Sequence, residues 1–150
     1  MRHDEEARRL FLAGYNCAQA VFCAFCDRTG LDTDTAARLS SSFGGGIGRL
    51  REVCGTCSGA LMALGMIRGY ADPADPEAKK RHYALVREYA RRFGEANGSI
   101  ICRELLRDVP VTAGGDPEPR TPEFYARRPC LRLAGEAARI LDDILEEENP

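Results

Sequence analysis

Seven cysteines are the residues of this 150-residue chain whose type and spacing point most directly to chemistry. They are Cys17, Cys23, Cys26, Cys54, Cys57, Cys102 and Cys130. An odd number leaves at least one thiol free, and the spacing is too scattered for a disulfide-held scaffold. Thiolates exchange with disulfides, and groups of thiolates hold metal ions or iron–sulfur clusters. The cysteines therefore indicate thiol or metal chemistry.

The strongest local motif is the Cys-x-x-Cys formed by Cys54 and Cys57. We expect it at the start of a buried helix, where free amides and the helix dipole stabilise a thiolate. Arg49 and Arg51 lie nearby in the sequence and favour the same charge state. Cys54 is therefore predicted to be the most acidic thiol of the chain.

A glycine-rich stretch directly precedes this motif, with four glycines among residues 44–48. Each glycine costs a helix about 1 kcal/mol relative to alanine, so we predict a loop. Its glycines would let the backbone pass close to Cys54. The alternative is that Gly44, Gly45 and Gly46 bind an anion through their amides, although the stretch lacks the Gly-Lys-Ser/Thr ending of a nucleotide-binding loop.

Cys102 and Cys130 are also predicted at helix starts, Cys102 in the first turn of a short helix and Cys130 directly after Pro129. Three cysteines at predicted amino ends of helices favour a functional role over chance. Cys17 differs, because the apolar periodicity places it inside a long first helix, as a core residue.

Cys23 and Cys26 form a second Cys-x-x-Cys near the end of that first helix, where the dipole raises a thiol pKa, and their role stays open. Neither pair is followed by histidine, which excludes covalent c-type haem attachment. The only histidines are His3 and His82, so a Cys/His zinc site has little support.

The elements that must position these cysteines are predicted to be helices, because apolar residues recur every three to four positions and no long stretch alternates with period two. The predicted helices cover residues 4–27, 33–43 with Thr33 or Asp34 as cap, 52–70, 77–95, 99–106 with Ser99 as cap, and 130–146. The helix over 52–70 is expected to be central. We predict an all-α fold, a single domain over residues 1–150 with five to six helices.

Composition narrows the classes of function. The formal net charge is -2 and no segment is strongly basic, so a nucleic-acid partner is not expected. The longest apolar run, residues 59–67, is far shorter than the roughly 20 residues of a membrane span. The amino-terminal residues lack the apolar segment of a secretory signal, so a cytoplasmic location with reduced cysteines is expected.

The cysteine and glycine pattern resembles that of the C_GCAxxG_C_C family of redox-active proteins over most of the chain. The segments that carry the resemblance are residues 14–21, 43–48, 53–62 and 102–105, together with Cys130. The resemblance implies that the site residues are Cys17, Cys54, Cys102 and Cys130, gathered around one site, with Gly55 and Gly59 as the motif glycines. Cys23, Cys26 and Cys57 fall outside the family's four.

Gly55 and Gly59 are four residues apart and so share one face of the predicted helix. We expect another helix or a ligand to approach the backbone closely there, so a larger residue at either position should be damaging. Thr56 stands where the family has alanine, and Thr56→Ala is expected to be nearly silent.

Three interpretations of the function remain. In the first, the protein is a thiol-based redox protein or oxidoreductase, in which Cys54 takes part in thiol–disulfide exchange with Cys17, Cys102 or Cys130. The partner of the protein would then be a redox protein or a small-molecule thiol or disulfide. The second is an iron–sulfur or other metal-binding module with the same four ligands, and Cys57 as a further candidate. The third is a helical interaction module with inert cysteines. Association of identical chains stays open.

Overall fold

The computed structural model describes residues 2–148, and these residues form an all-α fold. The longer helices are α1 (Asp4–Leu12), α2 (Cys17–Ala24), α4 (Thr33–Ser40), α6 (Gly55–Arg68), α7 (Pro76–Asn97) and α10 (Cys130–Glu148). The short ones are α3 (Cys26–Thr29), the 3-10 turn η1 (Ser41–Phe43), α5 (Gly44–Ile47), α8 (Cys102–Leu105) and α9 (Pro122–Arg127). Within the described part no strand forms, and one isolated bridge pairs Val53 with Ile101. The predicted fold class is confirmed, although the predicted five to six helices leave out several short ones.

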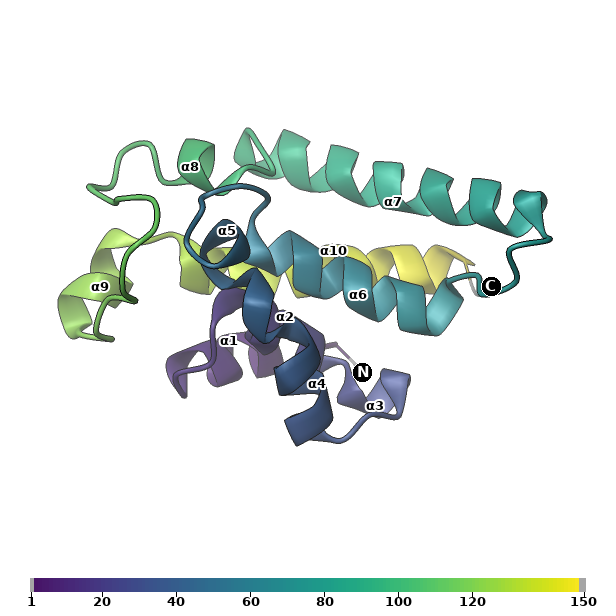
Figure 1. Cartoon of the computed structure of the whole chain (residues 1–150), viewed down its shortest axis with the longest axis horizontal. Helices are drawn as coiled ribbons and strands as arrows, with labels where there is room; N and C mark the ends of the chain where they lie inside the picture. Colours follow the sequence, from purple (N-terminus) through teal and green to yellow (C-terminus); the bar gives the residue numbers. More distant parts are fainter. Residues whose placement is uncertain (1, 149–150) are drawn as a thin grey trace.

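Helix α6 is central, as predicted. It packs against α2, α7 and α10, and α1 packs in turn against α2 and α10. Figure 1 shows α7 along one side of α6 and α10, with α1, α2, α3 and α4 on the other side. Helices α8 and α9 lie at the same end of the molecule, as do α5 and the start of α10. This end holds the amino termini of several helices.

The predicted continuous helix over residues 4–27 is wrong, because the helix is interrupted at residues 13–16 and again at residue 25. After α1, Gly14 adopts a left-handed φ of 109° and Asn16 then begins α2 with a capping box. The Asn16 side chain accepts the Gln19 amide at 2.9 Å, and the Gln19 side chain accepts the Asn16 amide at 3.0 Å. Apolar residues on both sides of the break face the same core, so their spacing does not reveal it.

Two predicted caps also differ. Asp32 caps α4 in place of Thr33 or Asp34, because its carboxylate accepts an amide of the first turn at 2.7 Å. Ser99 does not cap α8; its hydroxyl accepts the amide of Ile101, the residue before that helix, at 2.9 Å. These differences move the caps by one or two residues and leave the order of the elements unchanged.

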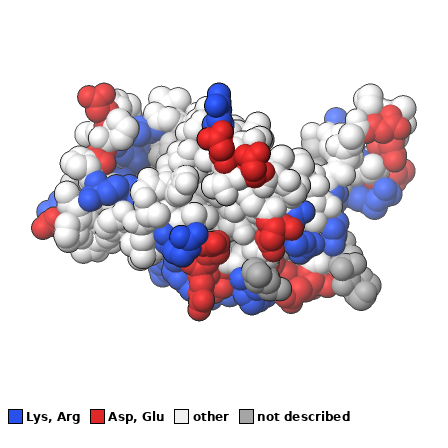
Figure 2. All heavy atoms as spheres, turned by 90° about the horizontal axis from the view of Figure 1, so that it is seen from below, with Lys and Arg blue, Asp and Glu red and all other residues white. Residues whose placement is uncertain are grey.

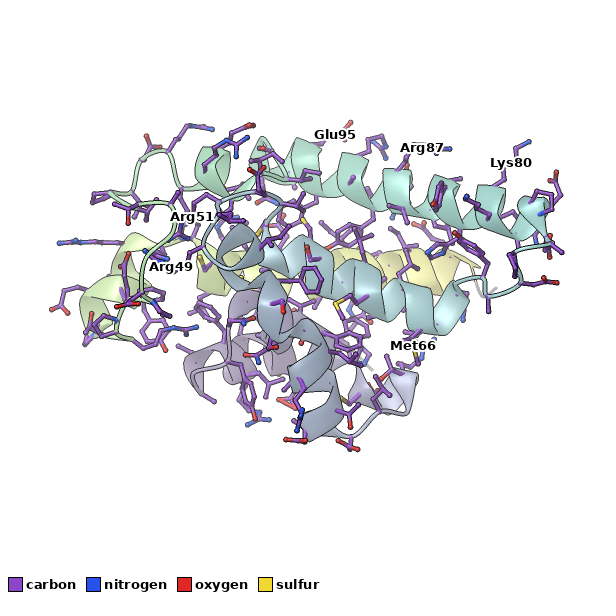
Figure 3. All side chains as sticks on the ribbon, viewed as in Figure 1. Arg49, Arg51, Met66, Lys80, Arg87 and Glu95 are labelled. Atoms are coloured by element: carbon purple, nitrogen blue, oxygen red, sulfur yellow. The ribbon has the colours of Figure 1, made fainter. Side chains whose placement is uncertain are left out.

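Helix α7 is amphipathic, as its sequence predicts. Tyr89 and Phe93 are fully buried, and the Tyr89 hydroxyl donates to a backbone carbonyl of α10 at 3.0 Å. Lys80, Arg87 and Glu95 point away from the rest of the molecule (Figure 3). On the face seen in Figure 2, basic and acidic side chains are interspersed rather than separated by sign. In the part that the structure describes, no helix has the length and apolar character that crossing a membrane requires.

His3 ties three helices together in a way that its sequence position does not reveal. Its buried ring places Nδ1 2.7 Å from Asp142 Oδ1 in α10 and Nε2 2.9 Å from Asp27 Oδ1 in α3. The ring also stacks on Phe25, with the centroids 4.0 Å apart. Burial lowers the pKa of His3, but the two carboxylates outweigh that effect and hold the pKa above its ordinary value.

We expect the contribution of His3 to the free energy of unfolding to be largest in acid solution. A raised folded-state pKa gives stability that is fully present below about pH 6.5 and is lost as the pH rises through the folded-state pKa. Urea unfolding should show His3→Gln to be less stable than wild type by about 2 kcal/mol at pH 5.5, with a smaller difference at higher pH. His82→Gln is the matched control, because His82 forms no ion pair among the described residues. A difference that grows with pH would contradict the expectation.

Candidate functional site

The four cysteines of the pattern all stand at the amino ends of helices. Cys54 is the residue immediately before α6, and Cys17, Cys102 and Cys130 are the first residues of α2, α8 and α10. The prediction that Cys17 lies inside a helix is therefore wrong, because the break before α2 exposes it at a helix start. The capping pattern of Asn16 and Gln19 is the sequence signal that would have found this position.

One cavity of about 380 Å³ is lined by all four of these cysteines. Their sequence positions are far apart, and short backbone pairing brings two of them together: the Cys54 amide donates to the Ile100 carbonyl at 2.7 Å, and the Cys102 amide donates to the Glu52 carbonyl at 2.6 Å. The rest of the wall includes Phe11, Gly44, Gly45, Arg49, Arg51, Gly55, Thr56, Glu118, Arg120, Phe124, Arg128 and Leu133. Cys23, Cys26 and Cys57 do not line it.

Cys54 is the thiol whose pKa is lowered, to about 7. The largest cause is the Cys57 thiol, which donates a hydrogen bond to the Cys54 sulfur, and burial opposes it. The Thr56 hydroxyl, 3.1 Å from the sulfur, and the amides of Thr56 and Cys57 act with Cys57. The hydrogen bond to Cys54, together with burial, raises the pKa of Cys57 well above its usual range. The pair thus holds an acidic thiol beside one that keeps its proton.

The remaining thiols have raised pKa values, and burial is the largest cause for Cys17, Cys23, Cys26, Cys102 and Cys130. The pKa of Cys17 reaches about 11, although a hydrogen bond from the Gly45 amide acts to lower it. At Cys102, Arg51 acts to lower the pKa, with Nη1 3.7 Å from Sγ. Arg51, which was predicted to favour the Cys54 thiolate, therefore lowers the pKa of Cys102 instead, whereas Cys54 owes its acidity to its own helix turn.

The glycine stretch forms an irregular turn that packs against the helices carrying these cysteines. Left-handed φ values occur at Gly45, Gly46 and Gly48, and also at Ile47, Arg49 and Arg51, where a side chain makes them unfavourable. A Cβ on Gly46 would lie 2.7 Å from Cys102 Cβ. The glycines therefore serve close packing, as predicted, but their neighbours are Asn16 and Cys102 rather than Cys54.

The motif glycines also serve close packing, between α6 and α2. A Cβ on Gly55 would clash with Cys17 Sγ, and one on Gly59 would lie 2.5 Å from the Ala18 carbonyl oxygen. Of the glycines named from the sequence, Gly44, Gly45 and Gly55 line the cavity, whereas Gly46 and Gly59 do not. The expectation that Thr56→Ala is nearly silent disagrees with the structure, because the buried Thr56 hydroxyl contacts the Cys54 sulfur.

Four arginines line the cavity, and only two of them, Arg49 and Arg51, were expected near the cysteines from the sequence. Figure 3 shows Arg49 and Arg51 after α5, at the end of the molecule where α8 and α9 lie. Arg49 Nε donates to the Gly114 carbonyl at 2.9 Å, and Arg51 Nε donates to the Thr112 carbonyl at 3.1 Å. These bonds hold the loop between α8 and α9 beside the cavity. Arg120 and Arg128 come from that loop and from the end of α9, and no local motif marks them.

Comparison with known proteins identifies the family of the chain. Neither the curated proteins nor the solved structures include a match to the chain. Residues 15–144 match the family model described as "Putative redox-active protein (C_GCAxxG_C_C)". The matched range contains the four cysteines of the cavity, the glycine stretch and both motif glycines. The chain therefore belongs to the C_GCAxxG_C_C family.

Proposed function

We propose that this protein carries out thiol–disulfide exchange with Cys54 as the attacking thiol. The observation that carries the proposal is the lowered pKa of Cys54, about 7, at the wall of a cavity. The thiolate is the attacking form, and a thiol whose pKa lies near the ambient pH attacks most effectively. Cys54 thus combines thiolate character with access to a bound substrate.

The exchange proceeds in two steps. The Cys54 thiolate attacks one sulfur of a substrate disulfide and forms a mixed disulfide, and the first substrate thiolate leaves. A second protein thiol loses its proton and attacks the Cys54 sulfur, which releases the second substrate thiolate and leaves a protein disulfide. The substrate gains two electrons and the protein thiols lose them. Cys57 is the proposed second thiol because it lies one helical turn from Cys54 and is the largest influence on the pKa of that thiol, and Cys17, which packs on Gly55, is the alternative.

The test is the pH dependence of alkylation at each cysteine, measured by mass spectrometry with iodoacetamide. We expect Cys54 to reach half of its maximal rate near pH 7 and the other thiols at higher pH. Thr56→Ala removes a hydrogen bond to the thiolate and should raise the half-maximal pH of Cys54 by about one pH unit. Thr56→Ser keeps the hydroxyl and is the control. Alkylation of Cys23 or Cys26 before Cys54 would overturn the proposal.

An iron–sulfur cluster is a second candidate, because four thiols, helix amino ends and several arginines surround one cavity and suit an anionic cluster. Cys17, Cys54, Cys102 and Cys130 would hold the cluster, which would supply electron transfer. A single metal ion has less support, since no three Cys, His, Asp or Glu side chains of the described residues are grouped closely enough. The test is to measure iron and sulfide in protein purified without oxygen. Stoichiometric amounts in the wild type that are lost in Cys130→Ser would favour the cluster.

A further inference from the structure

Arg51, a residue of the cavity wall, has one side-chain nitrogen without a hydrogen-bond partner among the described residues. Arg51 is only 3% exposed. Its Nε donates to the Thr112 carbonyl at 3.1 Å and its Nη1 to Cys102 Sγ at 3.7 Å. Its Nη2 is buried and finds no hydrogen-bond partner among the residues that the structure describes. A buried guanidinium N–H without an acceptor is costly, so the site is suited to an acceptor that the chain itself does not provide.

The charges of the wall identify the kind of acceptor. Glu118 is the one carboxylate that lines the cavity within the described residues, against four arginines. Arg128 lies 2.6 Å and Arg49 3.8 Å from that carboxylate. Arg120 donates to two backbone carbonyls, at 2.9 and 2.8 Å. Arg51 remains without a carboxylate, and the lining keeps an excess of positive charge.

We propose that the cavity binds a small disulfide or thiol that carries a carboxylate, and that Arg51 receives this carboxylate beside the thiols. A guanidinium offers N–H groups whose planar arrangement matches a carboxylate. Phe124 and Leu133 in the wall supply apolar contacts for the carbon chain that links the carboxylate to the sulfur. This assignment rests on the proposed exchange function and names its substrate class.

The dimensions of the site favour a small molecule over a protein disulfide. A cavity of about 380 Å³ is in the size range of small-ligand pockets. Cys54 is only 6% exposed, and the loop that Arg49 and Arg51 anchor lies beside it. A disulfide on the surface of a folded partner would have to reach this almost fully buried sulfur, whereas a short aliphatic disulfide is small enough to enter the cavity.

Three aliphatic disulfides of similar size test the assignment on the reduced wild-type protein: 3,3′-dithiodipropionate, bis(2-hydroxyethyl) disulfide and cystamine. Each rate of reaction at Cys54 is divided by the rate of the same disulfide with 2-mercaptoethanol, which removes differences in intrinsic reactivity. We expect the normalised rate of the dicarboxylate to exceed that of the neutral disulfide by about tenfold, with cystamine slowest. The net charge of -2 would favour cystamine instead, so this order reports on the cavity.

Two variants locate the effect. Arg51→Gln should bring the carboxylate-to-hydroxyl rate ratio down to about one, because the unpaired donor is lost. Arg107→Gln should keep the wild-type ratio, since Arg107 is exposed at the end of α8 and does not line the cavity. If Arg51→Gln does not fold, suberate on the wild-type protein replaces it. This dicarboxylate should slow the alkylation of Cys54, whereas 1,8-octanediol should not.

The failure of this assignment differs from failure of the exchange function. Equal normalised rates for the three disulfides would overturn the carboxylate assignment and leave exchange intact. A fast reaction with a protein disulfide, together with no reaction with dithiodipropionate, would also overturn the carboxylate assignment. No reaction at Cys54 with any disulfide would overturn the exchange function, and protection by suberate would still report whether the cavity holds a carboxylate.

Discussion

Replacing Cys57 by serine is expected to stop disulfide exchange after its first step, so that the mixed disulfide at Cys54 accumulates. Cys57 is 1% exposed, and its thiol is the largest cause of the lowered pKa of Cys54. Serine keeps a hydroxyl donor at this position, which preserves the acidity of Cys54, but it cannot attack a disulfide. Intact-mass spectrometry after a pulse of bis(2-hydroxyethyl) disulfide should show an adduct that lasts about 100-fold longer than in wild type, because an intramolecular attack is lost.

Parallel variants identify the second thiol. Cys17→Ser should release the adduct as fast as wild type if Cys57 is the resolving thiol, and accumulation in Cys17→Ser alone would assign that role to Cys17. Cys23→Ser is the control, because Cys23 lies six residues along α2, outside the cavity lining. Rapid release in both Cys17→Ser and Cys57→Ser would contradict the two-step scheme with either residue.

The fold was predicted best where one element has a continuous apolar face. Helices α6, α7 and α10 were predicted close to their observed bounds, because small or apolar residues recur at helical spacing and proline or glycine marks the ends. The break between α1 and α2 was missed, since the apolar spacing continues across it. There the local hydrogen bonds of Asn16 and Gln19, rather than periodicity, set the helix start.

The candidate site was predictable in its cysteines and not in their surroundings. The resemblance supplied the four residues that the structure places on one cavity. The acidity of Cys54 was expected from its helix start, but its largest cause is the Cys57 thiol, which the resemblance had set aside. The unpaired nitrogen of Arg51 could not be predicted. Arg51 itself has a left-handed backbone, and its side chain is held by the Thr112 carbonyl in a loop more than 50 positions away. Neither feature has a local sequence signal.

Gly59→Ala is expected to give a lower melting temperature than Gly65→Ala, although both place alanine in α6. A Cβ at Gly59 would lie 2.5 Å from the Ala18 carbonyl oxygen and 3.2 Å from the Phe22 amide nitrogen, both in the backbone of α2. Backbone atoms cannot rotate away as a side chain can, so α2 must move away from α6. Overpacking of this kind costs about 1–3 kcal/mol.

Gly65 is the matched control, because a Cβ there would meet nothing within 4 Å. Its replacement by alanine keeps only the gain in helix propensity, about 1 kcal/mol. Since both variants share that gain, the difference between their melting temperatures isolates the contact between α6 and α2, and we expect it to be about 4–12 °C. Gly59→Ala should also change the alkylation rate of Cys17, because α2 carries that thiol at its start. Equal stabilisation by both substitutions would show that the helices have room to separate, and the motif glycine would then have no packing role.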